Sequence, residues 1–376
     1  MEVIDEGGFG CIFRPPLDCE NGKSTDEKMI SKLQPEKYGK YEMKQIDRLK
    51  KICKKYIPDC GKYFITDIHM CKPKITPELL RQKKCYILEE MASSALSKKT
   101  KGKLKSTRKI TKKSLEKQKL NLLNMPYMGI NLHKYILNID FHHNESFINL
   151  NNSIIELYTN AIRILNNNNF YHNDIKTANI LVDENNNLRL IDFGLANNIA
   201  FIHKFIFNKP YVYILMTDYF LDQLILLKRQ NEIITREMVE PILNKYLVLI
   251  KLKISDNYLY TQEILEFMFP KQYNMAFKNP GTENIHPVLY EHFVNLCLRF
   301  NSLEEWTEIY IHNLDIVSIA IMYPDILCAM GIQKVDNPKL NKAIIDFYRK
   351  YVLECYEKIS QEMFIQDLNN LNMALL

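Results

Sequence analysis

The feature that most constrains this chain is an ordered set of polar residues around two short apolar runs near its middle. The segment His172–Asn179 carries an aspartate, a lysine and an asparagine, and Asp192-Phe193-Gly194 begins thirteen residues later. The apolar runs 179–182 and 188–191 lie between them, separated by the turn-forming stretch 183–187. The pattern predicts a β-hairpin with one polar group before it and the other at its end.

These polar residues are the groups that phosphoryl transfer needs. Asp174 can accept the proton of an attacking hydroxyl, and Lys176 follows it by two residues. The amide oxygen of Asn179 and the carboxylate of Asp192 are oxygen ligands of the kind that hold Mg²⁺. Either motif alone occurs by chance, but their order and the hairpin between them make a specific signal.

With these motifs the sequence resembles the eukaryotic-type protein kinase family. The resemblance implies an α+β, two-lobed protein-kinase-like fold with a small β-rich N-lobe and a mostly helical C-lobe. It implies ATP and Mg²⁺ as cofactors. In that family's terms Asp174 and Lys176 are the catalytic residues, and Asn179 and Asp192 are the metal ligands.

The N-terminal segment resembles the glycine-rich loop that covers the ATP phosphates. Glycines at 7, 8 and 10 let backbone N–H groups approach phosphate oxygens without an intervening Cβ. Asp5 stands where the family has its first glycine, and a carboxylate near phosphates is unfavourable. The loop alone is a weak signal, and Asp5 is expected to change how it sits.

The family's phosphate-contacting lysine and its helix glutamate also have counterparts. Lys32 lies in the apolar run 29–33, whereas the competing Lys28 has no apolar residues before it. Glu42 opens a helical pattern, and Glu36 is the alternative partner. The residues that the resemblance assigns to nucleotide binding are Ile4, Gly7, Gly8, Phe9, Gly10, Ile12, Lys32, Glu42, Tyr127, Met128 and Leu181.

Two further segments resemble family landmarks. Residues 124–129 resemble the hinge between lobes, with Met125 in the gatekeeper place and Tyr127 and Met128 as adenine contacts. Pro126 removes one backbone N–H from this hinge. Residues 313–323 resemble the buried helix that anchors the catalytic loop, because Asp315 within so apolar a run must find hydrogen-bond partners.

The sequence departs from the family pattern around the activation segment. Asn173 replaces the arginine that normally receives an activating phosphate, and no serine or threonine lies between Gly194 and Met216. We therefore expect activity without activation-segment phosphorylation. No Ala-Pro-Glu follows, and the 123 residues from Asp192 to Asp315 indicate a long helical insertion at about 216–303.

Periodicity gives a coarse division of the chain. Residues 1–128 are expected to form the N-lobe and residues 129–376 the helical C-lobe. Helices are expected at 41–54 and 153–165, and strands at 29–33, 62–65, 85–88 and 120–128.

Charge and cysteine content bound the partners and the compartment. The formal net charge is +6, but Lys98–Lys119 holds 11 basic residues and one acidic one, so the rest of the chain is mildly acidic. We interpret this basic insert (about 97–119) as a solvated loop; an acidic partner or an anionic surface is the alternative, and nucleic acid is disfavoured because no aromatic residue is present for stacking.

Nine cysteines without a Cys-x-x-Cys pair or a signal peptide favour a reduced, cytoplasmic protein without a structural zinc. No apolar run of about 18 residues is evident, the best being Tyr211–Leu227, so no membrane span is expected.

The sequence thus favours a Ser/Thr protein kinase that transfers the ATP γ-phosphoryl group to a protein hydroxyl. Lys176 favours the Ser/Thr branch over the Tyr branch. Two alternatives stay open: a kinase-shaped scaffold without catalysis, and a small-molecule phosphotransferase of the aminoglycoside or choline kinase type. The start of the chain, Gly-Gly-Phe-Gly-Cys-Ile-Phe-Arg-Pro-Pro-Leu with a later Ser-Lys-Leu, also resembles divergent kinases of large DNA viruses, which would place it in a host cell or virion.

Overall fold

The computed structural model describes most of both ends of the chain and groups them into two compact units. The first unit comprises Met1–Leu132 and Ala178–Ala196, and the second comprises His133–Thr177 and Asn197–Leu376. Residues 178–196 were expected in the C-terminal domain but group with the first unit. The residues described are 2–7, 10–22, 28–76, 79, 82, 84–85, 87–88, 119–198, 233–241, 294–295, 298–353, 355 and 357–375, so nearly all of the basic insert and of the 216–303 insertion lies outside them.

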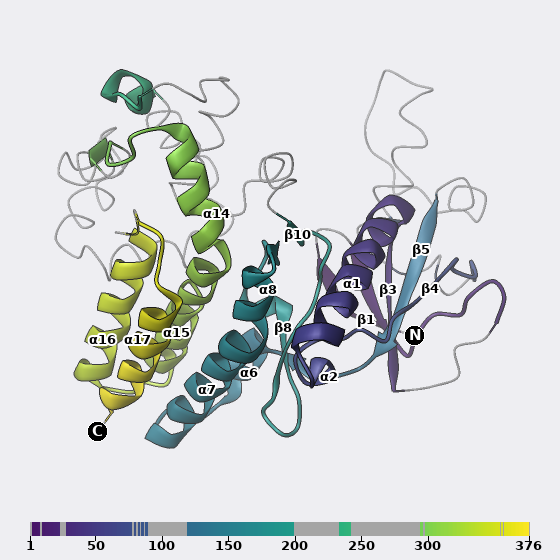
Figure 1. The fold of residues 1–376 in the computed structure, drawn as a ribbon. Coiled ribbons are helices and arrows are strands. Elements are labelled where there is room, and N and C mark those ends of the chain that lie inside the picture. The colour runs from purple at the N-terminus through teal and green to yellow at the C-terminus, as the bar shows by residue number, and fades with distance from the viewer. Residues whose placement is uncertain are drawn as a thin grey trace, which may run out of the picture. The chain divides into compact units, whose positions relative to one another are not determined.

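A five-stranded antiparallel sheet, ordered β1-β2-β3-β5-β4, forms the body of the first unit (Figure 1). The central strands β3 and β5 are buried along almost their whole length, and each combines apolar with polar residues. Ser31 on β3 is buried and hydrogen-bonded within the unit: its hydroxyl accepts from the N–H of Leu17 at 2.8 Å and donates to Asn124 of β5 at 2.5 Å. The strands are β1 (Glu2–Gly7), β2 (Gly10–Arg14), β3 (Met29–Pro35), β4 (His69–Cys71) and β5 (Leu120–Pro126).

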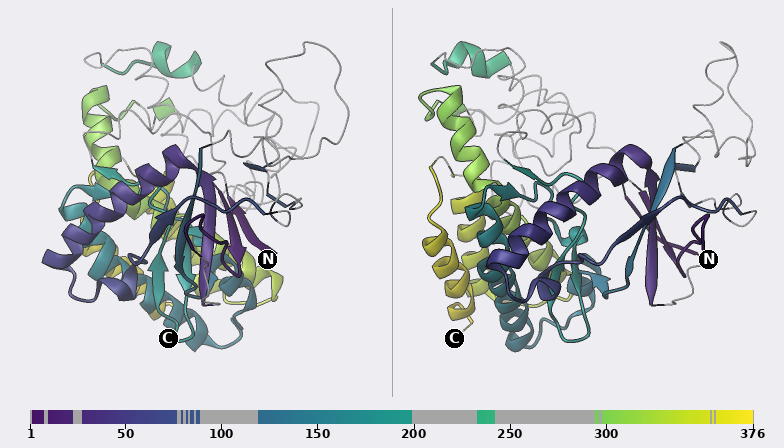
Figure 2. Two further views of the ribbon diagram at one scale, coloured as in Figure 1. Left: turned by 90° about the vertical axis from the view of Figure 1, so that its right-hand side faces the viewer. Right: turned by 45° about the vertical axis from the view of Figure 1, so that its right-hand side comes forward.

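One long helix, α1 (Glu36–Tyr56), follows β3 directly and packs against β3 and β5 (Figures 1 and 2). It includes the predicted helix 41–54 and extends it at both ends. Its buried side chains recur every three to four residues, as expected for a helix with one face on a sheet. The helix ends where the N–H of Ile57 caps the carbonyl of Cys53.

The described residues at 62–65 and 85–88 form no strand, although strands are expected there. Cys60–Tyr63 instead forms the short helix α2, because the N–H of Phe64 bonds back to the carbonyl of Cys60 at 3.0 Å. Ile87 and Leu88 are helical, not extended. Short apolar runs of this length do not distinguish a buried strand from a helical turn, so local composition alone could not decide.

A small three-stranded sheet, β6-β8-β9, completes the first unit. Its hairpin β8–β9 confirms the strand–turn–strand pattern expected at 179–191. Asp183 closes the turn by accepting hydrogen bonds from the N–H groups of Asn185 and Asn187, both at 2.9 Å. The strands are β6 (Ile130–Asn131), β8 (Ile180–Val182) and β9 (Leu188–Leu190), and the 3₁₀ turn η2 (Thr177–Asn179) precedes β8.

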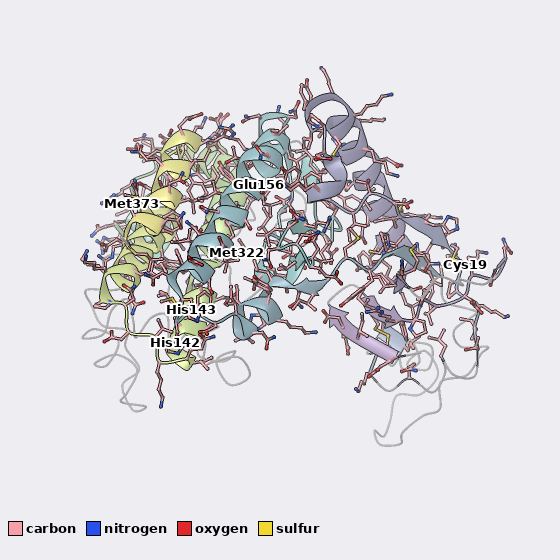
Figure 3. All side chains as sticks on the ribbon, turned by 90° about the horizontal axis from the view of Figure 1, so that it is seen from below. Cys19, His142, His143, Glu156, Met322 and Met373 are labelled. Atoms are coloured by element: carbon pink, nitrogen blue, oxygen red, sulfur yellow. A yellow bond between two sulfur atoms is a disulfide. The ribbon has the colours of Figure 1, made fainter. Side chains whose placement is uncertain are left out.

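The expectation that the cysteines are reduced is wrong for six of them. The structure pairs Cys11 with Cys85, Cys19 with Cys71, and Cys53 with Cys60, while Cys328 and Cys355 form no disulfide among the described residues. Sequence separations of 74, 52 and 7 residues gave no hint of which strands would be neighbours. Cys19, labelled in Figure 3, also has His69 nearby, but its sulfur is bonded to Cys71 and so does not complete a zinc site within the described residues.

The second unit is helical. The helix predicted at 153–165 is part of a longer run, α7 (Asn144–Leu157), the π-helical turn η1 (Tyr158–Ile162) and α8 (Arg163–Asn167). Figure 1 shows α15, α16 and α17 side by side, and Figure 3 labels Glu156 on α7 and Met373 on α17. The remaining elements are α6 (Leu132–Asn138), β7 (Phe170–Tyr171), which pairs with β10 (Asn197–Asn198), α14 (Leu303–Ala320), α15 (Tyr323–Ile332), α16 (Pro338–Tyr348), η3 (Arg349–Leu353) and α17 (Gln361–Met373).

The core of this unit combines aromatic packing with one buried polar network. Tyr323 is fully buried, its ring lies 5.1 Å from that of Phe347, and its hydroxyl donates to Asn151 of α7. The amide of Asn151 in turn donates to the carbonyl of Leu368 at 2.7 Å. This network joins α7, α15 and α17 through buried polar side chains.

The stretch Thr307–Ile332, across α14 and α15, is long and apolar enough to be considered as a membrane span, contrary to the expectation that no such run exists. It is 61% buried in the structure, and Asp315 within it is hydrogen-bonded inside the unit. These properties are those of a core helix, and no membrane span is established among the described residues.

Candidate active site

The glycine-rich segment forms the hairpin β1–β2 of the first unit. Gly7 pairs with Gly10 across the strands, and Gly8 and Phe9 at the tip lie outside the described residues. A Cβ on Gly10 would come within 2.7 Å of the carbonyl oxygen of Leu33, so glycine is required there. The hairpin has a register shift between Val3 and Asp5, and the Asp5 carboxylate accepts from the N–H of Glu6 at 2.8 Å.

The structure brings Lys32, Glu42 and Asp192 together. The Nζ of Lys32 on β3 lies 3.0 Å from Oε2 of Glu42 on α1 and 2.9 Å from Oδ1 of Asp192 after β9. Lys32 and Glu42 are 6% and 3% exposed, so both charges are removed from water. Of the alternatives, Glu36 instead pairs with Lys40.

Burial and pairing set the electrostatics of this cluster. Burial alone would lower the pKa of Lys32, but the carboxylates of Asp192 and Glu42 outweigh it and raise that pKa, so the ammonium stays charged. Burial raises the pKa of Glu42 against the opposing effect of Lys32. Gln34 adds a donor to Glu42 at 3.1 Å, which the sequence analysis missed because a glutamine in a strand carries no motif signal.

Asp192 and Asn179 lie on neighbouring stretches of backbone. The N–H of Ile191 donates to the carbonyl of Asn179 at 2.9 Å, which joins the start of β8 to the residue before Asp192. Asp192 has a positive φ of 63°, a backbone conformation that is uncommon for a residue other than glycine, and its Oδ1 accepts from the N–H of Gly194 at 3.4 Å. A carboxylate and an amide oxygen form the donor set that suits Mg²⁺, so these residues fit the predicted ion.

Several residues predicted to contact the nucleotide base share one apolar cluster. Ile12, Tyr127, Met128 and Leu181 pack against a buried group that includes Met125. Ile4 is instead 36% exposed on β1. The N–H of Tyr127 donates to the carbonyl of Lys28 at 2.7 Å and is therefore engaged within the protein. Of the two residues predicted to contact adenine, the backbone of Met128 is then the better candidate.

The second unit holds the catalytic-loop residues. The Nζ of Lys176 lies 2.9 and 3.0 Å from the two carboxylate oxygens of Asp174. The hydroxyl of Thr177, the residue after Lys176, donates to Asp325 of α15 at 2.6 Å. Asp325 was missed by the sequence analysis, because nothing in the sequence indicates that α15 contacts this loop.

Asp315 of α14 anchors the same loop, as the resemblance implied. Its carboxylate accepts from the backbone N–H of His172 at 2.9 Å and of Asn173 at 3.1 Å, and from the side chain of Asn166 at 2.8 Å. Burial raises the pKa of Asp315, while these hydrogen bonds oppose the rise. Asn173 has a positive φ of 64°, so the anchoring holds the loop in an unusual backbone conformation next to Asp174.

These features agree with a comparison against protein-family models. Residues 103–230, about a third of the chain, match the protein kinase domain. The sheet-bearing first unit and the helical second unit fit that assignment, and the chain has the two-lobed α+β fold of protein kinases.

Short segments of the chain are also similar to curated kinases. One is 52% identical over 40 residues to the serine/threonine-protein kinase ppk31 of Schizosaccharomyces pombe, covering 11% of this chain and 4% of that protein. Another is 54% identical over 37 residues to the probable serine/threonine-protein kinase KIN1 homolog of Encephalitozoon cuniculi (10% and 6%), and a third is 49% identical over 51 residues to mitogen-activated protein kinase kinase kinase 1 of Arabidopsis thaliana (12% and 8%). The chain thus spans less than a tenth of the length of these relatives. The matches support the eukaryotic-type protein kinase family.

Proposed function

We propose that the protein is an ATP- and Mg²⁺-dependent serine/threonine protein kinase. The observation that carries the proposal is the cluster in which Lys32 is held by both Glu42 and Asp192. Burying a lysine between two carboxylates costs desolvation free energy. Binding of a nucleotide phosphate by this lysine would account for an arrangement that is costly for stability alone.

In this proposal each residue has one task. Lys32, oriented by Glu42, binds the α- and β-phosphates, and Asn179 with Asp192 would hold the metal ion. Bound Mg²⁺ would neutralise the charge that develops on the transferred phosphoryl group. Asp174 accepts the proton of the substrate hydroxyl, and Lys176, already beside it, neutralises charge on the transferred group.

The test is transfer of label from γ-³²P-ATP to a mixture of protein substrates. The wild-type protein is expected to label serine or threonine, as read by phosphoamino-acid analysis. Asp174→Ala and Lys32→Met are each expected to reduce the initial rate by at least about 100-fold, because they remove the base and a phosphate-binding charge. Lys40→Met, on the same helix as Glu42 but paired with Glu36 at the surface, is the matched control and should keep the wild-type rate.

The outcomes separate the alternatives. Label on a small alcohol but not on protein would favour a small-molecule phosphotransferase. Nucleotide binding without any transfer would favour a scaffold. Incorporation that Asp174→Ala leaves unchanged would contradict the proposed role of Asp174.

A further inference from the structure

The short helix α2 is attached on one side to α1, which carries Glu42, and on the other side to β9, which precedes Asp192. On one side, Cys60 at its start is bonded to Cys53 near the end of α1, the helix that carries Glu42. On the other side, the carbonyl of Gly61 accepts from Nε of Arg189 on β9 at 3.0 Å. The segment therefore joins α1 to the strand that ends two residues before Asp192.

Arg189 makes this second attachment with Nε and holds another partner with Nη1. Its Nη1 lies 2.6 Å from Oδ2 of Asp183 in the β8–β9 turn, while its Nε holds Gly61. The residue is 9% exposed, so both contacts are made largely out of water. A lysine could not hold both partners with the same geometry.

Phe64, directly after α2, adds apolar contacts on the same side. It pairs with Leu190 of β9 in a parallel bridge, and its ring lies 5.8 Å from that of Phe193 in an edge-on arrangement. Phe193 is the residue after Asp192. The α2 segment thus contacts β9 before Asp192 and the chain immediately after it.

The disulfide is placed to act on Glu42 through the helix. Cys53 follows Glu42 by eleven residues, which is about three helical turns or about 16 Å, so the two side chains lie on the same face. Both are buried, with Cys53 4% exposed. A shift of α1 at Cys53 is carried to Glu42 because the intervening turns are continuous helix.

We propose that the Cys53–Cys60 disulfide and Arg189 form one positioning unit that holds α1 against β9 and so keeps Glu42 and Asp192 on Lys32. The inference rests on the proposed kinase function for its effect on turnover, but the coupling between the bridge and α1 does not. These three residues act through Glu42 and Asp192 and are positioning residues. Because the unit includes a disulfide, turnover becomes sensitive to thiol reductants.

The chemistry of opening the bridge is ordinary thiol–disulfide exchange. A dithiol such as dithiothreitol attacks the sulfur of Cys60, which is partly exposed, and Cys53 leaves as the thiolate and takes up a proton. The second thiol of the reagent then displaces Cys60, and the reagent departs as its cyclic disulfide. Two electrons and two protons are thereby transferred to the protein.

The experiment compares wild type, the double variant Cys53→Ser/Cys60→Ser, Arg189→Met, and all three substitutions together. Hydrogen exchange of the α1 amides at residues 36–46, around Glu42, is the first measurement, and initial rates with ATP are the second. We expect faster exchange at 36–46 in both variants and a loss of about tenfold in kcat/KM for ATP, with KM for the protein substrate unchanged. The combined variant should lose no more than the worse of the two, because both variants open one unit.

The bridge variant Cys19→Ser/Cys71→Ser is the matched control, since that disulfide joins the chain after β2 to β4 and does not include α1. It should leave exchange at 36–46 and kcat/KM unchanged. Dithiothreitol should slow wild type and this control, but not Cys53→Ser/Cys60→Ser. Unchanged exchange at 36–46 in both the bridge variant and Arg189→Met, or losses that simply add in the combined variant, would overturn the proposal. If wild type transfers no phosphate, the exchange measurement still decides the coupling and the proposed function alone fails.

Discussion

At the scale of single residues, the burial of charged side chains decides between candidate residues for the buried ion pair that the sequence offered in pairs. Lys28 and Lys32, like Glu36 and Glu42, were separated only by the pattern of neighbouring residues. The structure buries Lys32 with Glu42 and leaves Glu36 to Lys40. The positions were predictable because a strand and a helix fix which side chains point inward. The hydrogen bond that occupies the N–H of Tyr127 was not predictable, since it depends on where Lys28 lies in space.

Asp183 supplies a pH prediction at the same scale. Burial opposes its ionisation, but hydrogen bonds from Arg189 and Asn187 outweigh that effect and lower its pKa from 3.8 to about 2. A carboxyl group whose pKa is lower in the folded state stabilises the fold above its unfolded pKa, and the contribution is lost as the pH falls toward the folded value. Stability from this group is therefore complete above about pH 5 and declines between about pH 4 and pH 2.

The measurement is urea unfolding of wild type and Asp183→Asn across pH 3 to 7. Because Asp183 is only partly buried and water screens its pair with Arg189, we expect wild type to be more stable by only about 1 kcal/mol above pH 5, and by about half of that at pH 3. Asn185→Ala, whose side chain does not hold Asp183, controls for general effects on the turn. A difference between wild type and Asp183→Asn that stays constant over this pH range would contradict the ionic contribution.

At the scale of elements, long periodic segments were predicted well and short ones were not. The helix around Glu42 and the β8–β9 hairpin have clear periods and turn residues, whereas α2 is only four residues long and its role depends on a disulfide partner in α1. Disulfide pairing needs two Cα atoms within about 7 Å, which is a property of the folded chain. The cysteine pattern therefore favoured the wrong redox state for this unit.

Gly129, between β5 and β6, gives a prediction that belongs to this scale. Its φ is +112°, and a Cβ would lie 2.0 Å from the carbonyl oxygen of Val182 on β8. An alanine there would have to force β6 away from β8 and also adopt a backbone conformation that it disfavours. We expect Gly129→Ala to lower the free energy of unfolding by more than about 2 kcal/mol.

Chemical denaturation measures this effect, and Gly22→Ala is the matched control in the same unit. A Cβ on Gly22 meets nothing within 4 Å, so that variant should stay within about 0.5 kcal/mol of wild type. Equal stability of the two variants would mean that the approach of β8 to Gly129 does not constrain the fold.

At the scale of the whole molecule, the fold class was predictable because the motifs are spread over most of the chain and occur in the order expected for one fold. The family match covers residues 103–230, whereas Lys32 and Glu42 lie before it and Asp315 lies after it. The structure brings Lys32 and Glu42 to Asp192 in one unit, and Asp315 to the loop before Asp174 in the other. The motifs could not predict the hydrogen bonds between elements, such as those of Arg189 with Gly61 and of Thr177 with Asp325.

The last prediction concerns the increase in thermal stability of the whole chain when it binds a nucleotide. A ligand that binds only the folded protein at about 100 times its Kd stabilises it by about 2.7 kcal/mol, which corresponds to a rise in Tm of about 2–4 °C for a domain of this size. ADP with Mg²⁺ should therefore raise the Tm more than ADP with a chelator. Asp192→Asn should lose the metal-dependent part of the rise, because it removes the ionised metal ligand.

Asp174→Ala should keep the full metal-dependent rise, because the base acts on the substrate hydroxyl and not on nucleotide binding. Differential scanning fluorimetry of the three proteins separates binding from chemistry without requiring a known protein substrate. A rise that persists in Asp192→Asn would assign the metal to other ligands, and a rise lost in Asp174→Ala as well would show that the two residues do not have separate roles. The contrast between these variants thus tests whether Asp192 binds the metal ion while Asp174 acts only on the substrate hydroxyl, which transfer assays alone cannot resolve.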